Sequence, residues 1–180
     1  MRLEDFKDLE EDFQITFKER LRDYMRIFNL GDDHRIIAMH MGGVFLECLL
    51  KHKIISMYEL KKCKYVKKNE VWFSDEAVRE IVAEDKPTEQ YIKSRGIINP
   101  GHNLINAIKL LRDLDESLNS YDIELVNNPL INDSKEYRSF IDLEYCTIKD
   151  FRNLENTFDS WIKSFNNLKS IIVAYKGWEE

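Results

Sequence analysis

The segment from Asp33 to about Ile55 constrains the fold most, because its apolar residues leave almost no polar face. A helix of this kind has to be covered on several sides, so we expect it to be the central helix of a bundle. Gly42 and Gly43 lie in its interior, where each glycine costs about 1 kcal/mol of helix stability relative to alanine. We expect the close approach of another helix at this pair to compensate for the cost.

Amphipathic segments are predicted on both sides of the apolar one. Hydrophobic residues recur every three or four positions from Leu3 to Asn29 and again from Phe151 to Tyr175, which is the period of one helix face. Gly31 suits the left-handed turn that ends the first of these helices. The heptad spacing of the last segment is typical of a helix that faces the core of its own chain, and a homodimer seam is the alternative.

A further helix is predicted from about His102 to Ser120. The residues from Tyr121 to Ser134 are predicted to form a loop, because asparagine, aspartate and proline cluster there. The pattern over residues 56–99 is irregular and is interpreted as an insertion. With only 6 glycines and 3 prolines, the chain favours long helices. We therefore expect one all-α domain over residues 1–180, an up-and-down helical bundle of four to five main helices.

Several classes of protein are disfavoured by the sequence. No apolar run approaches the roughly 20 residues of a membrane span, and the opening MRLEDFKDLEEDF is acidic where a signal peptide would be basic. Cys48, Cys63 and Cys146 are widely separated and form no CxxC pair. We therefore expect a cytoplasmic protein without membrane association, disulfide framework, metal site or cofactor.

Two polar residues interrupt the apolar helix on one face. His40 and Glu47 are seven residues apart, hence about 10 Å from each other along the helix, with Gly43 between them. Each needs a partner if it is buried. One interpretation is a polar seam that fixes the helix register, with His102 as one partner. The other is a ligand or RNA cleft whose floor is Gly43.

Lysines gather after this helix, although the net charge of the chain is −6. Interleaved aromatic rings (Tyr58, Tyr65, Trp72 and Phe73) suit a single-stranded RNA or a nucleotide, and a solvated arm is the alternative. The lysines are Lys51, Lys53, Lys61, Lys62, Lys64, Lys67 and Lys68. Of these, all except Lys53 are predicted to bind nucleic acid or nucleotide, together with Glu47.

Three short motifs resemble those of HEPN domains (higher-eukaryote and prokaryote nucleotide-binding). The stretch Gly43 to Lys51 is similar to the family's central helix, with its glycine, glutamate and lysine. Gly101-His102-Asn103-Leu104 is similar to the Gly-His-Asp-Leu that opens the next long helix. Asp142-Leu143-Glu144-Tyr145 resembles the family's Asp-Leu-Arg-Tyr, with Glu144 in place of the usual arginine.

The resemblance implies RNA or nucleotide binding and, in many members, metal-independent endoribonuclease or toxin activity in a homodimer. Members of this kind use an Arg and a His with four to six residues between them, and the sequence offers Arg35 with His40 and Arg95 with His102. The residues predicted to be catalytic are therefore Arg35, His40 and His102. A nucleotidyltransferase-type antitoxin is the partner that the resemblance implies. The alternatives are a non-catalytic binding or protein-interaction module, and a purely structural helical protein.

Overall fold

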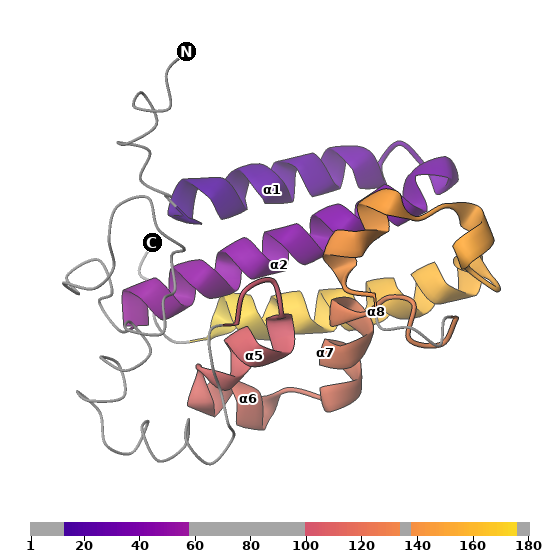
Figure 1. The fold of residues 1–180 in the computed structure, drawn as a ribbon. Helices are drawn as coiled ribbons and strands as arrows, with labels where there is room; N and C mark the ends of the chain where they lie inside the picture. Colours follow the sequence, from indigo (N-terminus) through magenta and orange to yellow (C-terminus); the bar gives the residue numbers. More distant parts are fainter. Residues whose placement is uncertain (1–12, 58–99, 134–137, 176–180) are drawn as a thin grey trace, which may run out of the picture.

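The computed structural model describes residues 13–57, 100–133 and 138–175, and within these ranges the regular elements are all helical (Figure 1). The all-α bundle predicted from the sequence is thus confirmed. In chain order the elements are α1 (Phe13–Phe28), η2 (Asp32–His34), α2 (Arg35–Met57), α5 (Leu104–Lys109), α6 (Arg112–Ser117), α7 (Ser120–Asn127), η4 (Phe140–Tyr145), η5 (Ile148–Asp150) and α8 (Leu154–Ala174), where η denotes a 3₁₀ helix.

The three long helices set the frame of the molecule. The rings of Phe17, early in α1, and His52, late in α2, have centroids 5.4 Å apart, so these helices run antiparallel. Lys53 donates a hydrogen bond to the carbonyl oxygen of Tyr175 over 2.7 Å, which brings the C-terminal ends of α2 and α8 together. Helix α8 therefore runs parallel to α2, and the shorter elements α5, α6 and α7 lie on the other side of α8 and α2 from α1 (Figure 1).

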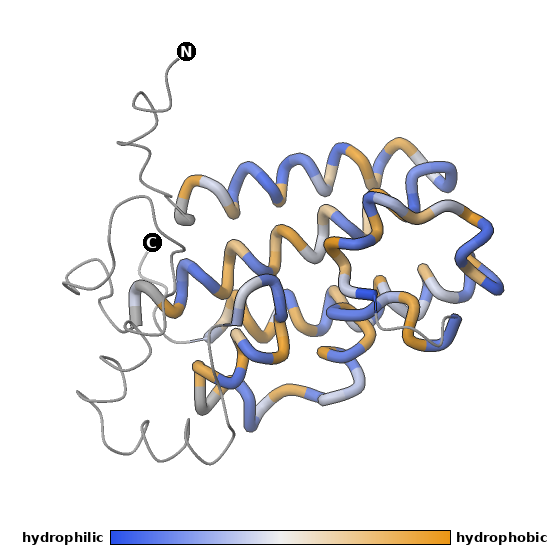
Figure 2. Tube along the Cα trace, in the orientation of Figure 1, coloured by the Kyte–Doolittle hydropathy of each residue, from blue (hydrophilic) through white to orange (hydrophobic). Residues whose placement is uncertain are grey.

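Helix α2 lies in the middle of the bundle, as predicted, and hydrophobic residues follow most of its length (Figure 2). A Cβ atom on Gly42 would lie 2.6 Å from the ring of Trp161 in α8. A Cβ atom on Gly43 would collide with the ring of Phe140 in η4. Two neighbours thus approach α2 closely at these glycines, and the predicted close approach is confirmed, by a helix at Gly42 and by a 3₁₀ turn at Gly43.

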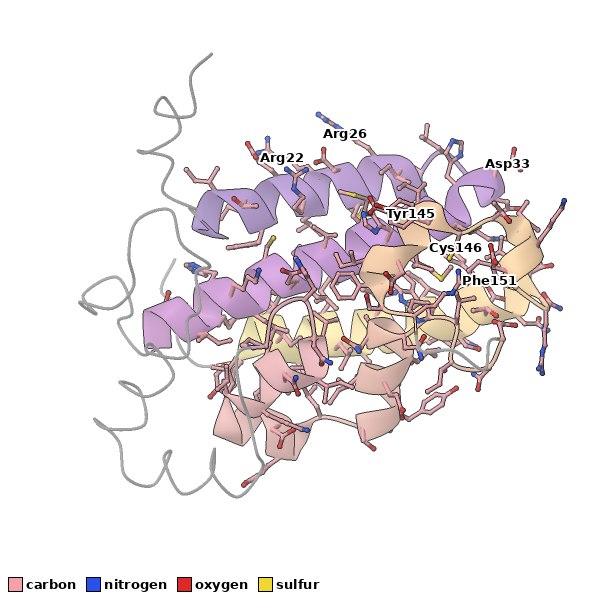
Figure 3. The ribbon with its side chains drawn as sticks, in the orientation of Figure 1. Arg22, Arg26, Asp33, Tyr145, Cys146 and Phe151 are labelled. Atoms are coloured by element: carbon pink, nitrogen blue, oxygen red, sulfur yellow. The ribbon has the colours of Figure 1, made fainter. Side chains whose placement is uncertain are left out.

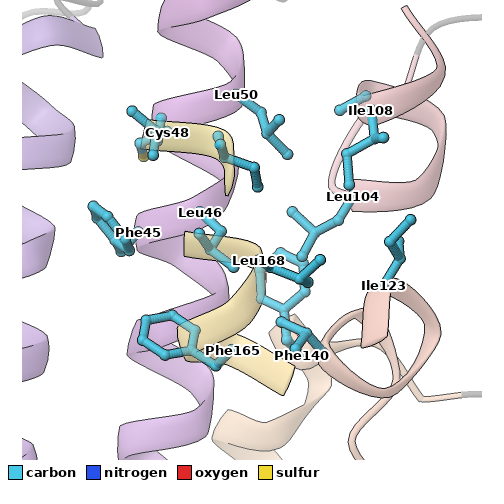
Figure 4. Close-up of a cluster of buried hydrophobic side chains, with 14 of the residues drawn as sticks. Phe45, Leu46, Cys48, Leu50, Leu104, Ile108, Ile123, Phe140, Phe165 and Leu168 are labelled. Atoms are coloured by element: carbon cyan, nitrogen blue, oxygen red, sulfur yellow. The ribbon is translucent and has the colours of Figure 1, made fainter. Parts of the chain in front are cut away.

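One hydrophobic core joins these elements, and Figure 4 shows part of it. The apolar residues with no more than 1% of their surface exposed include members of α2, α5, α6, α7, η4 and α8, which indicates a shared interior. They include Phe45, Leu46, Leu49, Leu50, Ile54, Leu104, Ile108, Val126, Phe140, Trp161, Phe165, Leu168 and Ile172. Over the described ranges, none of the helices has the combination of length and hydropathy that a membrane crossing needs.

The flanking helices agree with the sequence pattern where they are described. Helix α1 ends at Phe28, and Gly31 follows with a φ of 96°, which confirms the predicted glycine turn. The heptad positions Trp161, Phe165 and Leu168 of α8 are fully buried within one chain, so this seam belongs to the core rather than to a dimer. Residues 3–12 of the first predicted helix lie outside the described part of the chain.

The helix predicted from His102 to Ser120 is wrong in one respect, because it is divided into α5 and α6. The break falls at Leu110 and Leu111, and both leucines are fully buried. Adjacent residues of a continuous helix point about 100° apart, so an amphipathic surface helix would leave one of them outside its apolar stripe. The backbone of Leu111 leaves the helical region (φ −106°, ψ 82°), and the two side chains enter the core together.

The loop predicted from Tyr121 to Ser134 is also wrong over its first half, where α7 forms. Ile123, Leu125 and Val126 are buried on this helix. The asparagines that suggested a loop stand at its end instead. Asn127 is fully buried, and its side-chain oxygen accepts a hydrogen bond from the backbone N–H of Leu104 over 2.8 Å.

Candidate functional site

Glu47, Lys51 and His102 form a compact polar cluster at the side of α2. The Lys51 Nζ lies 2.5 Å from Glu47 Oε1, and both side chains are less than a tenth exposed. His102 Nδ1 lies 3.0 Å from each oxygen of the same carboxylate. The His102 side chain is 66% exposed. The contact between Glu47 and His102 is the one that the polar-seam interpretation expected.

Local structure explains why these three side chains meet. Glu47 and Lys51 are one turn apart on α2, so they project from the same side of the helix. His102 stands just before α5, after Gly101 with its φ of 51°. Asn103 caps α5 by accepting a hydrogen bond from the backbone N–H of Asn106 over 3.0 Å. This cap and the bond from Leu104 to α7 fix the backbone on the C-terminal side of His102.

The cluster joins a buried ion pair to an imidazole that reaches solvent. The Lys51 ammonium neutralises the Glu47 carboxylate, without which a buried carboxylate would be costly. The carboxylate accepts hydrogen bonds, so it selects the imidazole tautomer with its proton on Nδ1. In the neutral ring, Nε2 then carries a lone pair. An oriented imidazole of this kind can take up or release a proton on a bound hydroxyl group.

His40 engages a different part of the molecule. Its Nδ1 lies 3.0 Å from the carbonyl oxygen of Phe140, and its side chain is partly buried. The ring of Phe140 packs on Gly43, between His40 and Glu47. The predicted cleft with Gly43 as its floor is therefore wrong, because an aromatic side chain fills the space that the missing Cβ leaves.

Arg35 lies at the start of α2, in a third environment. It forms an ion pair with Asp32 over 3.0 Å, and its guanidinium carbon is 5.7 Å from the centre of the Phe158 ring. Arg35 precedes Glu47 by twelve residues, a separation of about 18 Å along the helix axis. The structure therefore does not bring Arg35 into the cluster of Glu47, Lys51 and His102 within one chain.

Most of the predicted basic arm lies outside the described residues. This applies to Lys61, Lys62, Lys64, Lys67 and Lys68, and to residues 58–99 of the insertion predicted over 56–99, which include Arg95. Two lysines of the group are described, and both are buried rather than solvated: Lys51 in the cluster, and Lys53 at 3% exposure.

Lys53 has a structural role that the sequence reasoning missed. Its ammonium donates to the carbonyl oxygen of Tyr175 and, over 3.4 Å, to that of Val173, both at the end of α8. A cation there also suits the negative end of the helix dipole. Burial lowers the pKa of Lys53 from its ordinary value. The signal in the sequence was its position inside the apolar segment, where a solvated lysine is rare.

Within the described ranges, no three His, Cys, Asp or Glu side chains are grouped so that they could hold a metal ion. Comparison of the chain with known protein families, with curated proteins and with solved structures found no match.

Proposed function

We propose that this chain is a HEPN-like RNA- or nucleotide-binding protein that cleaves RNA without a metal ion, with His102 as its acid–base group. The contact between His102 and the buried Glu47 carboxylate carries the proposal, because it couples a fixed imidazole orientation to solvent exposure. The similarity of Gly43–Lys51 and Gly101–Leu104 to the family motifs supports it.

In the proposed reaction, Nε2 of His102 takes the proton from a ribose 2′-hydroxyl group. The 2′-oxygen then attacks the adjacent phosphorus, the bond from phosphorus to the 5′-oxygen breaks, and the leaving oxygen receives a proton. Glu47 holds the Nδ1–H and stabilises the imidazolium ion that forms, as a carboxylate does in a catalytic triad. Lys51 balances the charge of that carboxylate inside the protein.

A cleavage assay on total RNA in EDTA tests this function. The His102→Ala variant should lose cleavage by about 100-fold or more, the usual contribution of a general base or acid. Arg35→Ala and His40→Ala test the alternative catalytic pair in the same assay. Wild-type protein that leaves RNA intact, or equal cleavage by wild type and His102→Ala, contradicts the proposal.

A non-catalytic binding module is the second candidate. The distance of about 18 Å between Arg35 and Glu47 along α2 favours it, because a nuclease also needs a cation to neutralise charge on the phosphate. RNA or nucleotide binding without cleavage, measured by fluorescence anisotropy, identifies this case. A nucleotidyltransferase-type antitoxin would be the partner of a toxin, and co-expression that suppresses toxicity would support it.

A further inference from the structure

His102 is the histidine of this chain that presents its ring to solvent. Its side chain is 66% exposed, whereas the other three histidines are only partly exposed. His40 contacts a backbone carbonyl oxygen of η4, the ring of His52 faces α1, and the Nδ1 atom of His34 is buried. Among the four histidines, His102 is therefore the one that a reagent in solution reaches most easily.

The contact with Glu47 determines which ring nitrogen of His102 is nucleophilic. Nδ1 lies 3.0 Å from both oxygens of the carboxylate, so Nδ1 holds the proton and Nε2 keeps its lone pair. A ring nitrogen with a free lone pair is a nucleophile, and histidine forms covalent intermediates through it. The same carboxylate stabilises the positive charge that the ring acquires when Nε2 forms a new bond.

The charge balance beside the ring permits an anionic reagent to approach. A carboxylate on its own would repel a phosphoryl group. The Lys51 Nζ lies 2.5 Å from Glu47 Oε1, so the two side chains together carry no net charge. A phosphoryl group that approaches Nε2 of His102 therefore meets a neutral ion pair behind an exposed imidazole.

We propose that His102 is a phosphorylation site, which accepts a phosphoryl group on Nε2 from a phosphoramidate, a donor with a phosphorus–nitrogen bond. The lone pair of Nε2 forms a bond to phosphorus, and the phosphorus–nitrogen bond of the donor breaks. The donor nitrogen, which carries an extra proton beforehand, leaves with the electron pair as a neutral amine. Nδ1 keeps its proton, and Glu47 balances the charge of the ring. Because one phosphorus–nitrogen bond replaces another, the transfer needs no further source of energy.

Phosphorylation of His102 also regulates the RNA chemistry proposed above. Once Nε2 carries phosphorus, it has no lone pair with which to take the proton of a ribose 2′-hydroxyl group. The added phosphoryl group is negatively charged and repels the phosphates of RNA. This regulatory consequence rests on the proposed function, whereas the phosphorylation itself does not.

Incubation of the full chain with potassium phosphoramidate in EDTA tests the inference, with intact mass and phosphorus NMR as readouts. Wild type should gain one phosphoryl group, on Nε2 of His102, at least about tenfold faster than N-acetylhistidine, because the carboxylate raises the basicity of the ring. His102→Ala should not react at that rate. Glu47→Leu/Lys51→Met removes both charges together and so leaves no unpaired charge buried. This double variant should react as slowly as N-acetylhistidine, and on both ring nitrogens.

Arg22→Met is the matched control, because it removes an exposed cation on α1 (Figure 3), on the other side of α2 from α5 (Figure 1). It should leave the rate of phosphorylation unchanged. The inference is overturned if wild type reacts no faster than N-acetylhistidine, if the phosphoryl group lies on Nδ1, or if the double variant reacts as wild type does.

The double variant at Glu47 and Lys51 is checked for folding by circular dichroism. If it does not fold, the rate in wild type and the nitrogen that carries phosphorus decide the inference on their own. Phosphorylation of a protein that never cleaves RNA overturns only the proposed function. Cleavage of RNA by a protein that stays unphosphorylated overturns only the inference.

Discussion

Glu47 is a buried carboxylate whose charge is balanced inside the protein by Lys51. The Glu47→Gln substitution keeps the shape of the side chain but leaves the Lys51 ammonium buried without a counter-charge. We expect the free energy of unfolding to fall by about 3–5 kcal/mol, the usual effect of breaking a buried ion pair from one side. Urea denaturation followed by circular dichroism measures this change.

The double variant Glu47→Gln/Lys51→Met is the control for that experiment, because it removes both charges. It should be more stable than Glu47→Gln alone, since no unpaired charge remains buried. The coupling energy from the double-mutant cycle then reports the interaction of the two side chains. A Glu47→Gln protein as stable as wild type would show that solvent, rather than Lys51, balances this carboxylate.

The burial of Lys53 should make the stability of the protein depend on pH. Burial lowers its pKa in the folded protein, so between that pKa and the ordinary lysine value of about 10.4 the unfolded chain binds more protons than the folded one. Stability therefore rises with pH in this window. We expect the difference in unfolding free energy between wild type and Lys53→Met to shift in favour of wild type from about pH 8 to about pH 10. A difference that stays constant or moves the other way contradicts the burial of the ammonium.

The sequence pointed to the cluster at Glu47 through two observations, a glutamate on an apolar helix and a histidine in a Gly-His-Asn motif. The His102 contact followed from the need of a buried carboxylate for a partner. Two features of the cluster were not predictable from the sequence: Phe140 fills the space above Gly43, and Lys51 turns inward to Glu47. Both depend on how η4 and α5 dock on α2, and helix periodicity carries no information about that docking.

At the scale of elements, the absence of a side chain at Gly43 allows η4 to dock on α2. Gly43→Ala places a methyl group against the ring of Phe140. Overpacking costs about 1–3 kcal/mol, whereas the change from glycine to alanine gains about 1 kcal/mol of helix propensity. We expect a net loss of up to about 2 kcal/mol in thermal or urea unfolding.

Phe140→Leu supplies the control for this contact. In that background Gly43→Ala meets a smaller side chain, so it should cost less than in wild type and even become stabilising. An equal cost of Gly43→Ala in both backgrounds would show that Phe140 is not the group that excludes the methyl.

The amide of Asn127 links two elements, since it ends α7 and accepts the bond from Leu104 at the start of α5. Asn127→Ala leaves a buried N–H without an acceptor, which costs about 1–3 kcal/mol. Asn119→Ala removes an exposed cap at the start of α7 and should cost less, because water replaces the side chain. We also expect Asn127→Ala to impair RNA or nucleotide binding, because it loosens the backbone beside His102.

At the level of elements, the long helices were predictable and the short ones were not. Helix α8 follows from its periodicity, and α2 follows from the length of its apolar run. The break at Leu110 and the formation of α7 arise from tertiary contacts, since the core takes both Leu110 and Leu111 and covers the apolar face of α7. Tertiary contacts outweigh local propensity in such places. The loop prediction failed because the asparagines mark the end of a helix rather than a whole loop.

At the scale of the whole molecule, the net charge of −6 opposes the approach of a polyanion such as RNA. RNA binding then depends on a local concentration of cations, and Lys61, Lys62, Lys64, Lys67 and Lys68 form the densest group in the sequence. We expect the RNA affinity to fall as salt rises, with a log–log slope of about −0.7 for each phosphate contact to a single strand. Replacing these five lysines by glutamine should flatten the slope and weaken binding, whereas Lys163→Gln and Lys169→Gln on α8 should leave both unchanged. Fluorescence anisotropy at several salt concentrations measures this, and a salt-independent affinity would exclude the lysine group as the site of contact.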